Sequence, residues 1–278
     1  MRFKILIILL LSSIQVFAGG WNKKKGGFYF KLGERAIIAK NFYDFSGEAI
    51  PIRTLGNFTT SVYGEYGISD KWDAIAYLPF YVRNTLNSLV GGSSGRELVA
   101  GEINNGIGDF DLGVKRLLFQ NNGHVMSASL ILGLPTGESD HPQGLLTGDG
   151  EFNQFVNLEY GKGLGSKSFI GLSAGFNNRA TGFTNEFRAG AEIGTFLFNS
   201  LWLIGKTSLL KSIENPNVTG NPNAQGLFAN NVNFLSVGAE ASYKFYKNFS
   251  VVGGAFTALY GKNILAAAAF ELGFSIDM

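Results

Sequence analysis

Cysteine is absent from the 278-residue chain, so neither a disulfide framework nor thiolate chemistry is available to it. Charge is scarce as well: Asp, Glu, Lys and Arg make up 16% of the residues, and the formal net charge is +2. Nucleic-acid binding normally requires a basic patch, so nucleic acid is not an expected partner. Beyond residue 18, no apolar run approaches the roughly 20 residues of a membrane-spanning helix. If this chain enters a membrane, it must do so as a closed barrel of strands.

The first 18 residues have the pattern of a secretory signal peptide. Arg2 and Lys4 precede an apolar core over residues 5–11, and Val16 and Ala18 are small residues at the spacing that a signal peptidase reads. The apolar core is too short to cross a hydrocarbon layer of about 30 Å, which disfavours a membrane anchor. We predict cleavage after Ala18, leaving residues 19–278 as one exported barrel domain.

Segments of about ten residues that alternate between apolar and polar side chains recur along the mature chain. Such a period of two is typical of half-buried strands, and about ten residues suffice for a strand to cross a membrane. About twelve segments meet this description, which predicts an all-β fold, an antiparallel up-and-down transmembrane β-barrel. They are residues 27–38, 57–68, 72–82, 107–119, 124–134, 151–161, 167–177, 185–197, 201–211, 234–246, 249–260 and 263–278.

The connections between these segments alternate in length. Short turns such as "ISDKW" and "FQNNG" follow the even-numbered segments, whereas longer connections such as 39–56, 83–106 and 212–233 follow most of the odd-numbered ones. Short periplasmic turns and longer outer loops characterise outer-membrane barrels, whereas a soluble periplasmic sandwich has no reason to sort its loops by length. We therefore expect the cell outer membrane of a Gram-negative bacterium as the location, outer-membrane lipid as a partner, and both termini in the periplasm.

Charged side chains occupy the polar face of several predicted strands. In 234–246, for example, Glu240 and Lys244 share a parity, and Ala239, Ala241 and Tyr243 share the other. Lipid outside and water inside would satisfy both faces, so we predict that the charged parity lines a lumen. The candidate lumen-lining residues are Asp109, Asp111, Lys115, Glu159, Arg188, Glu192, Lys206, Glu240 and Lys244.

The alternation continues to the last residue, in "FELGFSIDM" at 270–278. In a closed barrel the last strand pairs with the first, so this terminal strand would have no free edge. The pattern also resembles the terminal signal read by the outer-membrane assembly machinery, a further expected partner. That signal usually ends on Phe or Trp, whereas this chain ends on Met278.

Three consecutive motifs resemble a known family. They are "GDFDLG" at 108–113, "LPTG" at 134–137 and "GDG" at 148–150. Over about 55 residues this pattern is similar to that of the outer-membrane transporter family of the meta-pathway of phenol degradation. The matching positions are Gly108, Asp109, Leu112, Gly113, Pro135, Thr136, Gly137, Gly148 and Gly150. The resemblance implies a barrel that passes small molecules, with apolar or aromatic ones among the candidates.

The sequence offers little for catalysis. Asp109 and Asp111 lie two residues apart, and the Gly- and Asp-rich segment 134–151 contains His141, but lumen charges and turn chemistry account for both patterns. The only other histidine, His124, is expected at a periplasmic turn, which is the wrong end for a lipid-hydrolysing barrel. We predict no catalytic residue, metal site or cofactor, and a protein that is not an enzyme.

Two functions remain open from the sequence. The first is a channel for passive passage of small-molecule solutes through a narrow polar lumen. The second is a closed structural or adhesive barrel whose outer loops bind partners, because inward side chains or a folded-in loop could close a barrel of this width.

Overall fold

The computed structural model describes residues 19–180, 182–213 and 227–278, and all of its regular elements are strands. No helix in these ranges has the length and hydropathy to cross a membrane. The strands are β1 Phe28–Tyr43, β2 Ala49–Ser69, β3 Trp72–Leu86, β4 Leu89–Val90, β5 Glu97–Val99, β6 Glu102–Gly106, β7 Phe110–Asn121, β8 His124–Leu134, β9 Asn153–Leu164, β10 Ser168–Arg179, β11 Glu186–Leu197, β12 Leu201–Ser212, β13 Asn233–Tyr246, β14 Phe249–Lys262, β15 Ile264–Leu265 and β16 Ala269–Asp277.

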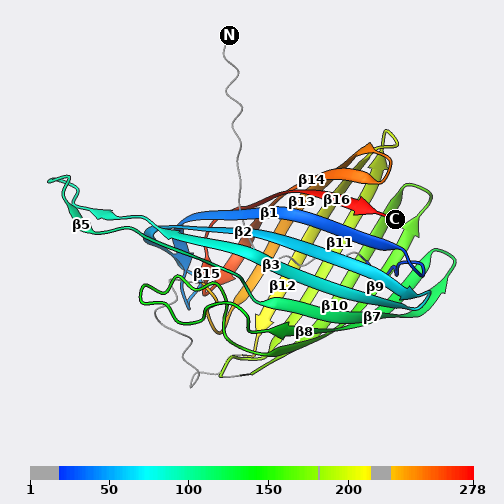
Figure 1. Cartoon of the computed structure of the whole chain (residues 1–278), viewed down its shortest axis with the longest axis horizontal. Helices are drawn as coiled ribbons and strands as arrows, with labels where there is room; N and C mark the ends of the chain where they lie inside the picture. Colours follow the sequence, from blue (N-terminus) through cyan, green and yellow to red (C-terminus); the bar gives the residue numbers. More distant parts are fainter. Residues whose placement is uncertain (1–18, 181, 214–226) are drawn as a thin grey trace, which may run out of the picture.

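The sheet closes on itself. Strand β1 pairs antiparallel with β2 along one edge and with β16 along the other, and every other long strand pairs with its neighbours in the chain. The result is a 12-stranded antiparallel barrel that contains β1–β3, β7–β14 and β16 (Figure 1). The predicted pairing of the first and last strands is confirmed, from Tyr29 opposite Asp277 to Ala36 opposite Phe270.

The short turns, the start of β1 and the end of β16 gather at one end of the barrel, which we call the turn end. The Asn122–Gly123 turn illustrates why these turns are short: both residues have positive φ, at 48° and 78°. Asn-Gly adopts this type I′ geometry readily, and its twist matches that of the flanking strands β7 and β8. The opposite end carries the longer connections, and we call it the loop end (Figure 1).

The structure corrects several predicted boundaries at the loop end. Residues 39–56 are not a long loop, because β1 and β2 continue as a hairpin as far as Tyr43 and Ala49. The predicted strand 263–278 is interrupted at residues 266–268, and its first part, β15, pairs with the tip of β1. The predicted loop 83–106 contains β4, β5 and β6. Backbone pairing therefore continues beyond the region where apolar and polar side chains alternate.

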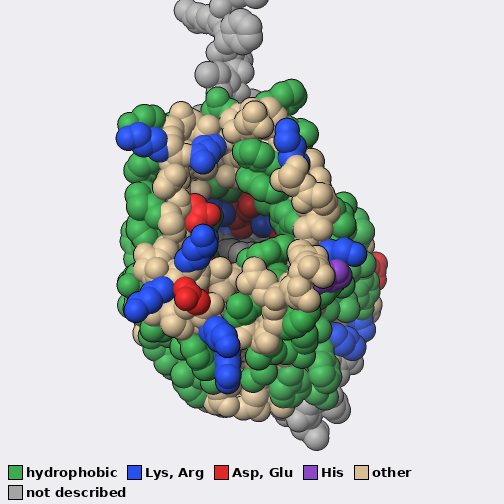
Figure 2. Space-filling view, turned by 90° about the vertical axis from the view of Figure 1, so that its right-hand side faces the viewer, with side chains coloured by type: hydrophobic (Ala, Val, Ile, Leu, Met, Phe, Trp, Pro, Cys, Tyr) green, Lys and Arg blue, Asp and Glu red, His purple; other side chains and the backbone are tan. Residues whose placement is uncertain are grey.

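The two faces of the wall differ as expected for a barrel in lipid. In β1 the side chains of Phe30, Leu32 and Ile38 are exposed, whereas Lys31 and Arg35 are 6% and 7% exposed. The view onto the turn end shows apolar side chains around the outer wall and a central hollow with acidic and basic side chains at its depth (Figure 2). Apolar residues therefore cover the exterior and charged residues occupy the interior.

The interior becomes apolar near the loop end. There, loop residues 145 and 227 fold inward and pack against the inner faces of β1, β2 and β3. The sequence left open whether loop 83–106 or loop 212–233 folds inward; of these, residue 227 of the second does so, and residue 145 of the connection 135–150 does so as well. The buried cluster comprises Ile37, Ala39, Leu55, Leu86, Leu145, Leu227, Leu265 and Ala269.

Candidate functional site: the charged bore

We call residues 19–25 the N-terminal strap. Residues 19–23 lie inside the barrel, and Lys24 and Lys25 are exposed at its turn end. The Gly19 nitrogen is 3.1 Å from Glu192 Oε1 on β11, and Ser127 on β8 donates to the Gly20 carbonyl at 2.5 Å. The Lys23 amide donates to Asp73 Oδ2 on β3 at 3.1 Å. The strap thus follows the inner wall from β11 to β3, near the turn end, and narrows the bore there.

Trp21 anchors the middle of the strap. Its ring packs edge-on against Phe169 of β10, with 5.6 Å between the ring centroids. The ring also lies over Gly161 of β9, where an added Cβ would come within 2.5 Å of it. Glycine at 161 therefore provides the space that the indole occupies, and this packing holds the strap to the wall.

Next along the bore is a network of ion pairs on strands β1, β12, β13 and β16. The Lys31 ammonium is 3.2 Å from Glu271 and 3.7 Å from Glu240, and Lys206 is 3.2 Å from the same Glu240 oxygen. Each side chain belongs to a different strand, so the network links strands from both sides of the barrel's closing seam, between β1 and β16.

A second network occupies the opposite wall. Lys115 of β7 is 1% exposed, and its ammonium is 3.1 Å from Glu65 of β2 and 3.6 Å from Asp73 of β3. Glu159 of β9 lies near this group and accepts hydrogen bonds from Ser129 at 2.9 Å and from Asn157 at 3.1 Å. Carboxylates outnumber cations on this side, so the bore has a negative wall here.

At the loop end, Arg179 connects the wall to the folded-in loop 135–152. Its guanidinium pairs with Asp149 at 2.9 Å, with Glu186 of β11 at 2.8 Å, and with Glu151. Asp109 holds the same loop by accepting hydrogen bonds from the amides of Gly137 at 2.8 Å and Asp149 at 2.7 Å. Both Asp109 oxygens are therefore committed to loop backbone.

This arrangement makes the loop attachment sensitive to pH. Burial raises the pKa of the Asp149 carboxyl to about 7, against the opposing effect of Arg179, and Asp109 adds to the rise. Burial also raises the pKa of Glu151. Because the pKa of Asp149 is higher in the folded loop than in the unfolded chain, its contribution to stability is largest at low pH and disappears as pH rises through 7.

We therefore expect loop 135–152 to detach more readily at pH 8 than at pH 6, by about tenfold in the opening equilibrium. Hydrogen exchange of the loop amides, corrected for intrinsic exchange, measures that equilibrium. The Asp149→Asn variant should lack the Asp149 part of the pH dependence. An equal pH dependence in the variant and the parent would contradict this assignment.

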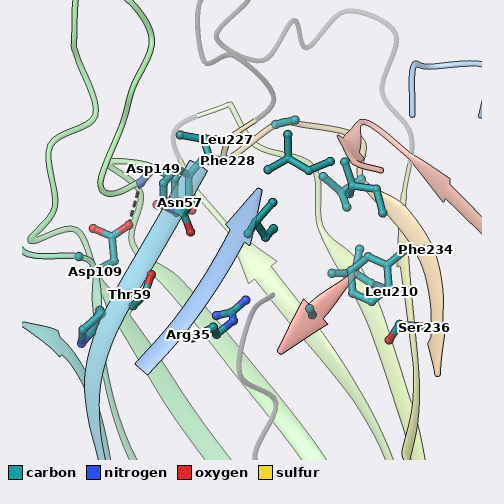
Figure 3. A pocket seen from close by; sticks show the side chains of 18 of the residues that line it. Arg35, Asn57, Thr59, Asp109, Asp149, Leu210, Leu227, Phe228, Phe234 and Ser236 are labelled. Atoms are coloured by element: carbon teal, nitrogen blue, oxygen red, sulfur yellow. Dashed lines mark hydrogen bonds between the residues drawn. The ribbon is translucent and has the colours of Figure 1, made fainter. Parts of the chain in front are cut away.

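Between the two narrowed regions lies a cavity of about 420 Å³. One side is polar, with Arg35, Asn57, Thr59 and Asp109 among its lining residues, and the other side is apolar (Figure 3). The volume falls in the range of small-molecule sites in proteins, about 300–1,000 Å³. The apolar side is formed by Leu210, Leu227, Phe228, Phe234 and Phe256.

The nine candidate lumen residues lie in these groups as follows. Asp109, Asp111 and Arg188 line the cavity, Lys115 and Glu159 lie on the negative wall, Lys206 and Glu240 belong to the seam network, Glu192 holds the strap, and Lys244 is exposed near the turn end. Their role as the lining of an open conduit stays a prediction.

The position of Asp109 and Asp111 on a lumen-facing parity indicates Lys115, Arg188, Lys206 or Lys244 as their ion partners, and this expectation is wrong for the described residues. Lys115 pairs with Glu65 and Asp73, and in the described residues no ion pair joins it to Asp109 or Asp111. The sequence pattern did not single out Lys31, Arg35 or Arg179, although Lys31 and Arg35 share the inward parity of a predicted strand. No group of three or more His, Asp or Glu side chains in the described ranges is placed to hold a metal.

Known structures share this architecture. An outer-membrane channel from Pseudomonas putida F1 matches with a TM-score of 0.69 at 12% identity, over 94% of this chain and 98% of that one. The NanC porin matches at 0.53 and 7% identity, over 90% of this chain and 100% of the other. The translocator domain of the autotransporter NalP from Neisseria meningitidis matches with a TM-score of 0.52 at 13% identity, over 92% of this chain and 90% of that one.

The fold is that of an outer-membrane barrel. At these identities the likeness concerns the fold, and together with the apolar exterior it assigns the protein to the outer membrane. Searches with family models and against curated sequences found no match. Membership of the phenol-degradation transporter family therefore remains a hypothesis based on the nine motif positions.

Proposed function

We propose that this outer-membrane barrel is a passive channel for small solutes and that its bore favours cations. The observation that carries the proposal is the charged interior, because a water-filled bore solvates charged side chains that an apolar filling would not. Carboxylates outnumber cations among the ionisable side chains of the bore and its loop end. The carboxylates are Glu65, Asp73, Asp109, Asp111, Asp149, Glu151, Glu159, Glu186, Glu192, Glu240 and Glu271, and the cations are Lys23, Lys31, Arg35, Lys115, Arg179, Arg188 and Lys206.

Planar-bilayer recording tests this function. We expect discrete opening steps, and a reversal potential in a potassium chloride gradient that shows preference for potassium over chloride. Asp111→Asn should reduce that preference, because it removes a carboxylate that lines the cavity and forms no ion pair in the described residues. Asp109 is unsuitable for this test, since its substitution would also release the loop.

The second candidate function is a closed barrel whose outer loops bind partners. The apolar cluster at the loop end favours it, because this cluster fills part of the cross-section. Absence of conductance at all voltages, in a preparation with normal folding, would overturn the channel proposal and leave this alternative.

A further inference from the structure

The cavity contains two charged side chains that the protein itself does not neutralise by contact. Among its lining residues, Arg179 and Arg188 pair with carboxylates, Asp149 and Glu186 pair with these arginines, and Asp109 accepts two backbone amides. Arg35 and Asp111 remain. Neither has an ion pair within 4.0 Å in the part of the chain that the structure describes.

Arg35 is the more unusual of the two. Its side chain is 7% exposed, it points into the cavity (Figure 3), and its Nε has no hydrogen-bond partner. Glu271 lies opposite Arg35 on β16, but its carboxylate contacts Lys31 at 3.2 Å. A buried guanidinium with unused donors is costly unless something binds it, and a carboxylate accepts two parallel bonds from such a group.

Asp111 lies on the same wall as Arg35. Tyr77 of β3 is directly opposite Asp111 in the sheet register, and Arg35, Tyr77 and Asp111 all line the cavity. A cation site and an anion site thus open into the same space. A ligand with a carboxylate alone would meet the Asp111 carboxylate unfavourably, and a ligand with an ammonium alone would leave Arg35 without a partner.

The remaining side of the cavity is apolar. Leu210 and Phe234 face the polar wall across the cavity, and Leu227 and Phe228 cover it from the loop end (Figure 3). A bound molecule that satisfies both charges therefore has room for an uncharged apolar group as well.

We propose that the cavity binds zwitterionic α-amino acids with apolar side chains, their carboxylate on Arg35 and their ammonium on Asp111. This inference rests on the proposed channel function and names its solute class. The apolar side chain of the ligand would lie against Leu210, Phe234 and their neighbours, which gives selectivity over small polar amino acids.

Four ligands with related bodies test the proposal by their block of the single-channel current. Phenylalanine carries both charged groups, 3-phenylpropionate lacks the ammonium, phenethylamine lacks the carboxylate, and glycine lacks the apolar group. Phenylalanine should block at the lowest concentration. Arg35→Gln should weaken the block by phenylalanine by at least about tenfold and change the block by phenethylamine little. Asp111→Asn should weaken the block by phenylalanine and by phenethylamine but not the block by 3-phenylpropionate.

The outcomes separate this inference from the channel function. Steady conductance that phenylalanine does not alter, together with no binding in titration calorimetry, would overturn the inference and leave the channel intact. If no conductance is seen but calorimetry detects binding of phenylalanine, and Arg35→Gln abolishes that binding, the channel function would be overturned and the binding inference would stand. Stronger binding of 3-phenylpropionate than of phenylalanine would refute the role of Asp111. The folded state of each variant is checked by its resistance to unfolding on unheated gels.

Discussion

Deleting residues 20–23 is expected to raise the single-channel conductance by about twofold or more, because the strap occupies cross-section in a bore of intermediate width. The deletion keeps Gly19, and so the predicted processing site, but removes Trp21 from its place against Phe169 and Gly161. It also removes the Lys23 amide that binds Asp73. Planar-bilayer recording in symmetric potassium chloride gives the measurement.

Lys24→Ala is the matched control. Its side chain belongs to the same segment but is exposed, so its loss should leave the conductance within the scatter of the parent. Trp21→Ala should give an intermediate increase with more frequent fluctuations, because the backbone contacts of the strap remain and the ring packing is lost. Equal conductance of the deletion variant and the parent would mean that the strap does not limit flow.

Glu192 bears on the same prediction. If cleavage occurs after Ala18, the Gly19 nitrogen becomes an α-ammonium, 3.1 Å from the Glu192 carboxylate. A hydrogen bond that involves charged partners is roughly twice as strong as a neutral one, so processing would fasten the strap. Glu192→Gln should therefore produce transient openings to the conductance level of the deletion variant.

The sequence predicted the barrel because period-two alternation reports directly on a wall with lipid on one side and water on the other. The same rule could have found Lys31 and Arg35, which share the inward parity of β1. Glu34 violates that rule, since it lies on the outward face and accepts a 2.5 Å hydrogen bond from Thr60. Alternation thus identifies a face statistically and does not place each charge.

The strap and the loop contacts could not be predicted in this way. "GGWNKKKGG" has no period, and its side-chain contacts include residues 45, 173 and 254 positions away in the chain. Arg179 sits at the last position of β10, beyond the predicted strand, and its partners come from a loop and a neighbouring strand. Such contacts follow from closure of the barrel, which brings distant residues together in a way that local sequence does not encode.

Replacing Lys115 by Met is expected to cost about 3–5 kcal/mol of folding free energy, because it leaves buried carboxylates without their cation. The Lys115 ammonium lies 3.1 Å from the Glu65 carboxylate and 3.6 Å from the Asp73 carboxylate, and all three side chains are 3% exposed or less. Urea unfolding in lipid vesicles gives the difference in free energy. The cost should fall as the carboxylates become protonated at acidic pH.

The double-neutral background distinguishes charge from shape. With Glu65→Gln and Asp73→Asn in place, Lys115→Met should reduce the folding free energy much less, because neither of the two carboxylates that Lys115 contacts is then present. Lys244→Met provides the surface reference, because Lys244 is exposed and such a change is usually worth about 0.5 kcal/mol or less. A Lys115→Met cost that persists unchanged in the neutral background would assign the loss to packing of the lysine stem.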